Sequence, residues 1–506
     1  MPNNLPRDYQ ILRGLVRILT RAFFAEIACE GVSRIPARTG GLLVSWHPNG
    51  LVDPALILAQ FPGRVVFGAR HGLFNWPLLG VLMRRLGTVP IYRAGDLTEK
   101  NRKERLEANE ASLDALARQL AGGSFSALFP EGLSHDNPHL SEIKTGAARL
   151  YYKAVELARP DESLPVIIPV GLHYDRKDIF RSRVLVCFHE PIRLSPELSI
   201  RQGEEVDTAR RRELYRALTQ EIEKTLVGVA RATEDWDLHH LMHRLRKLVR
   251  AERASRAGAE LPRPDIAEWE LGFARVWHAY ESRRKTHPDK IEALIQDVAE
   301  YDRCLRVVGL EDYELSRSPR VTSPLWVGIV LLQFVAVFLL FPPILLVGYV
   351  INVLPYYALK GVSRVFSRET KDAATVKILG GSILFPCTWA LAAFLAARAH
   401  DEIHFMFPTL PDVPVTVAVV TVLLGIVGGF LALIYNELSQ ESWRALRVRI
   451  TRGRQRDVIK RLRETRADIY EAVDRLMQGL ELPGRVADDG RIISDEEDDL
   501  SDTQSD

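Results

Sequence analysis

Three long apolar segments in the last third of this 506-residue chain restrict its architecture more than any other feature. They cover residues 325–354, 378–397 and 413–435. The second and third have the roughly 20 apolar residues that a helix needs to cross a bilayer. The first would be about 45 Å long as one helix, which exceeds a hydrocarbon core of roughly 30 Å. We therefore predict a membrane region over residues 321–436.

Two prolines, Pro342 and Pro343, lie at the midpoint of the first apolar segment and remove two backbone donors. We expect a sharp reversal there, so that residues 325–354 form a helical hairpin that enters and leaves on one side. The other two segments then form an ordinary pair of crossings. The alternative is a single kinked crossing, which would place the loop of residues 360–377 on the opposite side of the membrane.

The distribution of positive charge indicates which side each loop occupies. Lysines and arginines cluster in residues 360–377 and directly after the third segment, whereas the loop between the second and third segments has none after Arg398. Because positively charged loops tend to stay in the cytoplasm, we expect residues 1–320, 360–377 and 437–506 to be cytoplasmic. The host membrane would be the bacterial inner membrane or the endoplasmic reticulum.

The formal net charge of +2 hides an acidic tail. Residues 485–506 contain nine acids and two arginines, a balance of −7, so the rest of the chain carries +9. A basic body suits anionic lipid headgroups and phosphorylated substrates, but it lacks the concentrated basic stripe of a nucleic-acid binder. We predict a disordered tail. The four cysteines show no paired spacing, which fits a reducing compartment.

Residues 1–30 predict an amphipathic helix, with Arg13, Arg17 and Arg21 four apart on one face. Two interpretations remain open: the helix packs on the next domain with its arginines in solvent, or it lies in the membrane interface on anionic lipid. Charged residues at helical period also predict a helical region over 205–320 and a basic amphipathic helix over 437–484.

Residues 31–204 alternate short apolar runs with helical stretches, which is typical of an α/β domain. We predict a mixed sheet flanked by helices. The expected strands are residues 41–45, 65–67, 88–91, 125–129, 166–171 and 184–188.

A histidine and an aspartate directly follow the first of these strands. His47 comes after residues 41–45, where ligands of open α/β sheets bind, and Asp53 lies six residues further on at a helix start. Such a pair suits alcohol acylation, because the imidazole accepts the hydroxyl proton while the carboxylate fixes its tautomer. The alternatives are a loop histidine without a catalytic role and a plain helix N-cap, which the neighbouring Pro54 favours.

Three further blocks also lie at strand ends. Residues 87–93 read Gly-Thr-Val-Pro-Ile-Tyr-Arg and end at Arg93, and residues 129–136 read Phe-Pro-Glu-Gly-Leu-Ser-His-Asp. The last block is the proline-flanked apolar strand of residues 164–172. One histidine, two acids and one arginine at strand ends predict a single site at one edge of the sheet.

In order and content, these four blocks resemble the glycerolipid (PlsC-like) acyltransferases. Five residues rather than the usual four separate His47 from Asp53, and Ser134-His135-Asp136 follows the third block where Thr-Arg or Ser-Arg is common. Both departures, and the run from Gly171 to Tyr174, are similar to the fungal-type glycerol-3-phosphate/dihydroxyacetone-phosphate acyltransferase branch, which also has carboxy-terminal membrane segments. The resemblance covers roughly the first 200 residues.

The resemblance implies a role for each matching residue. His47 would be the general base and Asp53 its orienting partner, while Arg93 would bind the substrate phosphate. Glu131 and Gly132, with Ser134, would shape or bind the acceptor. From the residues themselves, a guanidinium at Arg93 suits phosphate.

Three further cations near these blocks allow two interpretations each. Lys144, at a helix start, is either a second phosphate contact or an exposed helix-end lysine. Arg181 and Arg183 are either phosphate ligands or surface charges, and we expect at least one of them on the surface.

We therefore expect a membrane-bound O-acyltransferase that moves a fatty-acyl group from an acyl thioester to glycerol 3-phosphate or dihydroxyacetone phosphate. The reaction needs no metal and no cofactor, since acyl-coenzyme A or acyl carrier protein is a co-substrate. A lysophospholipid acceptor is the alternative substrate. A non-catalytic lipid-binding scaffold on the same fold is the alternative of another class, and the intact His47 and Asp53 argue against it. Partners are the two substrates and membrane lipids, and not nucleic acid.

Overall fold

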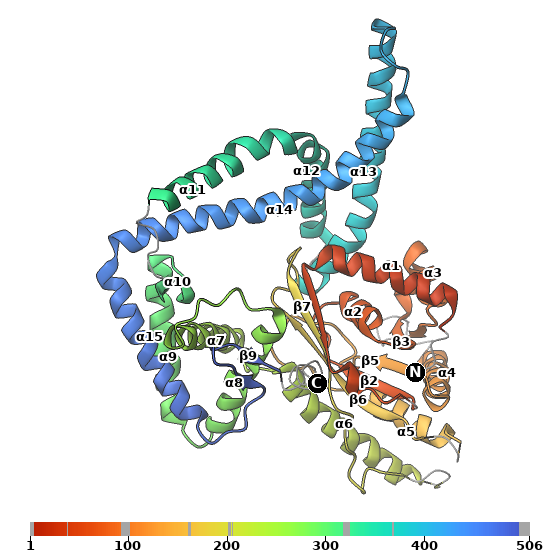
Figure 1. Ribbon diagram of the computed structural model, residues 1–506. Coiled ribbons are helices and arrows are strands. Elements are labelled where there is room, and N and C mark those ends of the chain that lie inside the picture. Colours follow the sequence, from red (N-terminus) through yellow and green to blue (C-terminus); the bar gives the residue numbers. More distant parts are fainter. Residues whose placement is uncertain are drawn as a thin grey trace, which may run out of the picture. The chain divides into compact units, whose positions relative to one another are not determined.

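The computed structural model describes residues 5–37, 39–92, 102–159, 163–200, 204, 206–316, 324–366 and 369–494 (Figure 1). The chain forms two compact units. One consists of Met1–His239 with Ser367–Thr375, and the other of His240–Phe366 with Val376–Asp506. Each unit is described by itself below.

The first unit contains a mixed sheet, as the sequence predicts, but with seven strands rather than the six expected. Its strand order is β1-β7-β6-β2-β5-β3-β4, and β6 with β7 is the antiparallel pair while the other neighbours are parallel. The strands are β1 (Glu26–Glu30), β2 (Gly41–Ser45), β3 (Val65–Arg70), β4 (Val89–Ile91), β5 (Phe125–Leu128), β6 (Val166–Tyr174) and β7 (Arg183–Phe188). All five residues of the central strand β2 are buried, which is typical of a strand covered on both faces.

Helices cover both faces of this sheet (Figure 1). They are α1 (Arg7–Phe23), α2 (Val52–Gln60), α3 (Pro77–Arg85), α4 (Arg102–Ala121), α5 (Gly146–Leu157) and α6 (Thr208–Ala230). Apolar residues of α4, α5 and α6 form one core with β2 and β6. Because α6 is part of that core, the unit extends past the predicted boundary at residue 204, and the helical region begins later than predicted.

The N-terminal segment differs from the predicted helix over residues 1–30. The helix α1 ends at Phe23, and Glu26–Glu30 form strand β1, which pairs with β7. A strand on the sheet edge is stabilised by this long-range pairing, which no local pattern in the sequence reveals. Arg13 and Arg17 of α1 donate hydrogen bonds to the carbonyls of Phe61 and Ala59, at the end of α2.

The second unit contains a helical region and the membrane segments. The helical region has α7 (Trp236–Arg256), α8 (Ile266–Arg283), α9 (Pro288–Val308) and α10 (Asp312–Ser316), and α15 (Arg456–Met477) returns to it from beyond the membrane segments. Strands β8 (Arg485–Val486) and β9 (Ile492–Ile493) form a small antiparallel ribbon, with Ile492 buried. The predicted disordered tail of 485–506 therefore begins too early, because an apolar side chain anchors its first part.

The membrane segments are helical throughout residues 324–366. Helix α11 (Pro324–Val335), a π-helical turn (Ala336–Leu340) and α12 (Phe341–Phe366) follow one another directly. The reversal predicted at Pro342–Pro343 is not found there. Proline is tolerated in a first helical turn, and a π-helical turn and prolines bend a helix without reversing it.

Two longer helices complete the membrane region, α13 (Thr370–Met406) and α14 (Pro414–Arg454). Among the described residues, three helices are long and apolar enough to cross a membrane: Leu345–Val365, Thr370–Met406 and Pro414–Val448. The predicted basic helix of 437–484 is divided between the end of α14 and α15, with the break at Gln455.

Asn352 of α12 connects all three apolar helices. Its side-chain amide donates to the carbonyls of Gly348 and Gly425, and its oxygen accepts from the Trp389 indole of α13. Gly348 also lies against Gly428 of α14, where a Cβ atom on either would come within 2.4 Å of the other backbone. Small residues of this kind let membrane helices approach closely.

Candidate active site

Three neighbouring strands bring the predicted site residues to one edge of the sheet. Strand β2 lies between β5 and β6 and is parallel to both. The loops that follow their carboxyl ends therefore meet. His47 follows β2, and Glu131 follows β5, so the first and third blocks converge as the sequence predicts.

His47 and Asp53 form a hydrogen-bonded pair. The distance from His47 Nδ1 to Asp53 Oδ2 is 2.8 Å, and Asp53 is fully buried while 15% of the His47 side chain is exposed. An ionised carboxylate only accepts hydrogen bonds, so Nδ1 carries the proton and Nε2 keeps its lone pair. The His47 ring stacks on Phe129, with 4.0 Å between centroids. Nε2, the ring nitrogen that does not face Asp53, is thus the one that can accept a proton.

Asp53 is not the helix N-cap that was considered as its alternative role. Helix α2 begins at Val52, and the residue before it, Leu51, makes no side-chain cap. The carboxylate instead accepts from the Asn49 backbone N–H, at 2.7 Å, within the loop that carries His47. Gly50 in this loop has φ +47°, a conformation that favours glycine. Asp53 therefore fixes both the loop and the imidazole.

Glu131 is fully buried, and both carboxylate oxygens are used inside the protein. Oε1 accepts from the His47 backbone N–H at 3.0 Å, and Oε2 accepts from the Ser141 N–H at 2.7 Å and from His135 Nε2. The His135 N–H in turn donates to the His47 carbonyl at 3.2 Å. Glu131 therefore connects the loops after β2 and β5.

Gly132 and Lys144 lie next to each other beyond the Phe-Pro-Glu-Gly turn. Gly132 has φ +71°, and a Cβ atom there would come within 3.0 Å of Lys144 Nζ. The Lys144 backbone N–H donates to the Pro130 carbonyl at 2.9 Å, and its side chain is exposed. Lys144 therefore has a free ammonium near the turn. Ser134 is half-buried in the same loop.

The other predicted cations are placed differently. Arg93 lies outside the described residues. Arg183 is buried, with ion pairs to Asp175 and Glu26, so it is neither a phosphate ligand nor a surface charge. Arg181 has φ +63° and donates its backbone N–H to the Phe23 carbonyl at 2.7 Å.

Several residues near the pair were not predicted as site residues. The Tyr174 hydroxyl donates to Asp53 Oδ1 at 2.5 Å, and burial together with the Asp53 charge raises the pKa of Tyr174 well above its ordinary value. Lys177 Nζ donates to the Pro48 carbonyl at 2.8 Å. The run from Gly171 to Tyr174, which is similar to the fungal-type branch, is the one sequence signal for Tyr174.

The short segment Ser367–Thr375, which follows α12 in the chain, also belongs to the first unit. At Gly50, a Cβ atom would lie 3.1 Å from the Lys371 carbonyl and 3.3 Å from Thr375 Oγ1. The start of α13 therefore lies beside the loop that carries His47 and Asp53. In the described part of the chain, no group of three His, Cys, Asp or Glu side chains is arranged to hold a metal ion.

Two family models match the chain. Residues 26–173 match the family described as "Acyltransferase", and residues 249–481 match "Glycerol-3-phosphate acyltransferase 2 C-terminal domain". The first unit thus contains an acyltransferase domain. Residues 249–481 of the second unit are similar to the C-terminal domain that the second model describes.

Individual relatives agree with these matches. Glycerol-3-phosphate O-acyltransferases 1 and 2 of Saccharomyces cerevisiae are 26% and 28% identical over 273 and 270 residues, which are 54% and 53% of this chain. The matched region is 34% of the length of each yeast protein. Lyso-ornithine lipid O-acyltransferase of Rhizobium meliloti is 28% identical over 185 residues, 32% of this chain and 58% of that protein.

One solved structure is also similar. It is the crystal structure of the 1-acyl-sn-glycerophosphate acyltransferase PlsC from Thermotoga maritima, with 19% identity and a TM-score of 0.28, covering 43% of this chain and 79% of that one.

Proposed function

We propose that this protein is a membrane-bound O-acyltransferase that transfers a fatty-acyl group from an acyl thioester to glycerol 3-phosphate or dihydroxyacetone phosphate. This is the first step of phospholipid and glycerolipid synthesis. The observation that carries the proposal is the hydrogen-bonded His47–Asp53 pair, in which Asp53 is buried and the His47 side chain is 15% exposed. The two domain matches favour a phosphorylated glycerol as acceptor.

In the proposed reaction, His47 Nε2 takes the proton from the acceptor hydroxyl while the oxygen attacks the thioester carbonyl. Asp53 stabilises the resulting imidazolium. The tetrahedral intermediate collapses with formation of the ester bond and release of the thiolate, which can take the proton from His47. The donor is acyl-coenzyme A or an acyl carrier protein.

Two cations are proposed to bind the acceptor phosphate. Lys144 presents an exposed ammonium beside Gly132, and Arg93 directly follows Tyr92 at the end of β4. The Asn109 side chain of α4 holds Tyr92 through hydrogen bonds of 2.9 Å to both its N–H and its carbonyl. Arg93 itself lies outside the described residues, so its part in the proposal rests on its place in the sequence directly after Tyr92.

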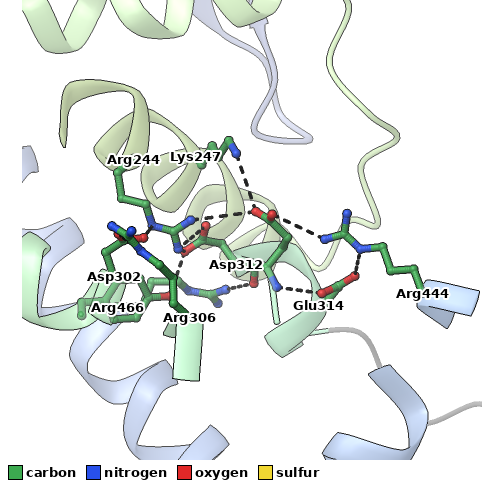
Figure 2. Close-up of polar contacts among 10 residues, drawn as sticks. Arg244, Lys247, Asp302, Arg306, Asp312, Glu314, Arg444 and Arg466 are labelled. Atoms are coloured by element: carbon green, nitrogen blue, oxygen red, sulfur yellow. Dashed lines mark hydrogen bonds and ion pairs between the residues drawn. The ribbon is translucent and has the colours of Figure 1, made fainter. Parts of the chain in front are cut away.

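We also propose that the acyltransferase domain, the helical region and the C-terminal end share the cytoplasmic side. The support is a network of ion pairs between residues before and after the membrane segments (Figure 2). Arg466 of α15, 1% exposed, binds Glu252 at 2.9 Å and donates to the Asp312 carbonyl at 2.7 Å. Arg444 of α14 binds Glu314 of α10 at 2.8 Å.

This network requires an even number of membrane crossings between residues 316 and 444, because both ends are held in one helical region. Three helices qualify by length and composition, so one of them does not cross. The start of α13 lies beside Gly50 of the acyltransferase domain, so the chain is back on the starting side by residue 371. We therefore propose that α11 and α12, which follow one another without a reversal at Pro342–Pro343, stay on one side without crossing, and that α13 and α14 cross as a pair.

Cysteine accessibility tests this topology. In sealed, oriented vesicles, Glu369→Cys should react with an impermeant maleimide from the cytoplasmic side, and native Cys304 of α9, which is exposed, should react from the same side. Thr409→Cys, between α13 and α14, should react only from the other side. Labelling of Glu369→Cys from the side opposite to Cys304 would refute the proposed arrangement.

Helix α1 is proposed to lie in the membrane interface with its apolar face, rather than its arginine face, toward lipid. Arg13 and Arg17 are held by α2, while Ile11 and Ile18 are 71% and 67% exposed. An environment-sensitive fluorophore at Ile18→Cys should shift to the blue in nanodiscs. The same probe at exposed Leu106 of α4 is the control, and equal spectra at both positions would contradict the proposal.

The function is tested with purified protein in nanodiscs, offered a long-chain acyl-coenzyme A with glycerol 3-phosphate, dihydroxyacetone phosphate or lysophosphatidate. We expect the first two to be preferred. His47→Ala should reduce turnover by about 10²–10⁴-fold, whereas His139→Ala, an exposed histidine in the neighbouring loop, should leave it unchanged. Near wild-type turnover in His47→Ala would refute the mechanism, and a preference for lysophosphatidate would change the substrate assignment.

A further inference from the structure

The Asp53 carboxylate is held from two sides. Its Oδ2 accepts from His47 Nδ1 at 2.8 Å and from the Asn49 N–H at 2.7 Å. Its Oδ1 accepts from the Tyr174 hydroxyl at 2.5 Å. A buried carboxylate with donors on both oxygens cannot rotate without breaking a hydrogen bond in a place that water does not reach. Tyr174 therefore holds the carboxylate oxygen of Asp53 that does not face His47, and so fixes the orientation of the carboxylate.

Tyr174 is itself rigidly placed, because it is the last residue of β6. That strand pairs with β2 on one side and with β7 on the other, where Tyr174 lies opposite Val184. The Asp175 N–H then donates to the Arg183 carbonyl at 3.0 Å, which continues the pairing beyond the strand. A side chain on such a scaffold keeps its position more precisely than one on a loop.

Lys177, three residues after Tyr174, forms hydrogen bonds with the loop that carries His47. The Asn49 side chain donates to the Lys177 carbonyl at 3.0 Å, and Lys177 Nζ donates to the Pro48 carbonyl at 2.8 Å. Lys177 also pairs with Asp136 at 2.6 Å, in the loop after the Phe-Pro-Glu-Gly turn. The segment from Tyr174 to Lys177 thus connects both loops of the site.

We propose that Tyr174 is a positioning residue for acyl transfer, which holds the Asp53 carboxylate in the one orientation that presents His47 Nε2 to the acceptor hydroxyl. The proposal rests on the proposed function. Tyr174 neither gives nor takes a proton in the reaction, and it does not touch either substrate. It acts through Asp53 on the orientation of the imidazole and on the stability of the imidazolium.

Loss of the Tyr174 hydroxyl should affect turnover and not substrate binding. Without the hydroxyl, Asp53 Oδ1 loses its donor, and the carboxylate gains freedom to turn away from His47 Nδ1. The imidazole is then aligned for only part of the time. Because alignment matters in the transition state and the substrates do not contact Tyr174, kcat should fall while both KM values stay nearly constant.

The test is Tyr174→Phe, with Tyr152→Phe as matched control. Tyr152 is buried in this domain, and its hydroxyl donates to the Leu198 carbonyl at 2.8 Å, away from the site. Both variants lose one tyrosine hydroxyl and the hydrogen bond that it donates. We expect a kcat about tenfold lower for Tyr174→Phe, with KM within twofold for both substrates, and an unchanged kcat for Tyr152→Phe.

A double-variant cycle separates positioning from a loss of folding. In the Asp53→Asn background the carboxylate that Tyr174 orients is already absent, so adding Tyr174→Phe should lower kcat by less than twofold. Full additivity of the two losses, or an equal fall in kcat for Tyr152→Phe, would overturn the proposal. Failure of the proposed function is distinguishable, because the unmodified protein would then show no acyl transfer to any acceptor.

Discussion

Replacement of Glu131 by glutamine tests whether this residue supports the site or binds the acceptor. The resemblance implies a role in the acceptor site, whereas the structure places both carboxylate oxygens against donors of the protein itself. Glutamine has nearly the same shape but one acceptor oxygen fewer. Its amide nitrogen must face either the His47 N–H or the pair formed by Ser141 N–H and His135 Nε2.

The expected destabilisation follows from counting these donors. The better orientation keeps the oxygen on Ser141 and His135 and leaves the His47 N–H buried against another donor. One unpaired buried donor costs about 1–3 kcal/mol, and two hydrogen bonds also change from a charged to a neutral acceptor. A total of about 3 kcal/mol corresponds to a fall in Tm of about 6–12 °C for a unit of this size.

The measurement combines thermal unfolding in detergent with steady-state kinetics. We expect Glu131→Gln to lower Tm and kcat together, since His47 loses its backbone anchor, and to leave KM for glycerol 3-phosphate nearly unchanged. Glu110→Gln is the control, because Glu110 is an exposed carboxylate with surface ion pairs to Arg149 and Lys153 that contribute at most about 1 kcal/mol. A raised KM with unchanged Tm and kcat would show that Glu131 binds substrate.

Three further changes have defined outcomes. Lys144→Ala should raise KM for the phosphorylated acceptor and leave KM for the acyl donor unchanged, and equal increases in both would contradict a phosphate contact. Gly428→Leu should lower the thermal stability of the membrane helices by several degrees, because its Cβ would meet Gly348 backbone atoms, whereas Gly328→Leu, with open space around it, should not. Arg466→Met removes the buried positive charge that pairs with the Glu252 carboxylate, and it should destabilise the helical region by about 3–5 kcal/mol. Protease resistance equal to that of the unmodified protein would refute this role.

The sequence determined most of the acyltransferase domain. Six of the seven strands were predictable because each is a short apolar run between turn residues, as in Gly41–Ser45 and Val166–Tyr174. The meeting of His47 and Asp53 was also predictable, because a residue that follows a strand and one in the next helical turn lie close together in any fold. These features depend on local pattern and short separation.

Long-range contacts decided what the sequence did not show. Strand β1 exists because Glu26–Glu30 pair with β7, more than 150 residues away in the chain. Tyr174 approaches Asp53 because β6 lies beside β2, although 121 residues separate the two side chains. No periodicity or spacing encodes such neighbours.

The membrane region shows the same division. Apolar composition determined that residues 325–435 include helices long enough for a bilayer, because the hydrocarbon core requires about 20 apolar residues in sequence. Composition did not determine that the chain stays helical through Pro342, nor that Arg444 and Arg466 bind residues 311–316, which precede these helices. Those contacts join segments about 130–150 residues apart, and only tertiary packing brings such charges within reach of one another.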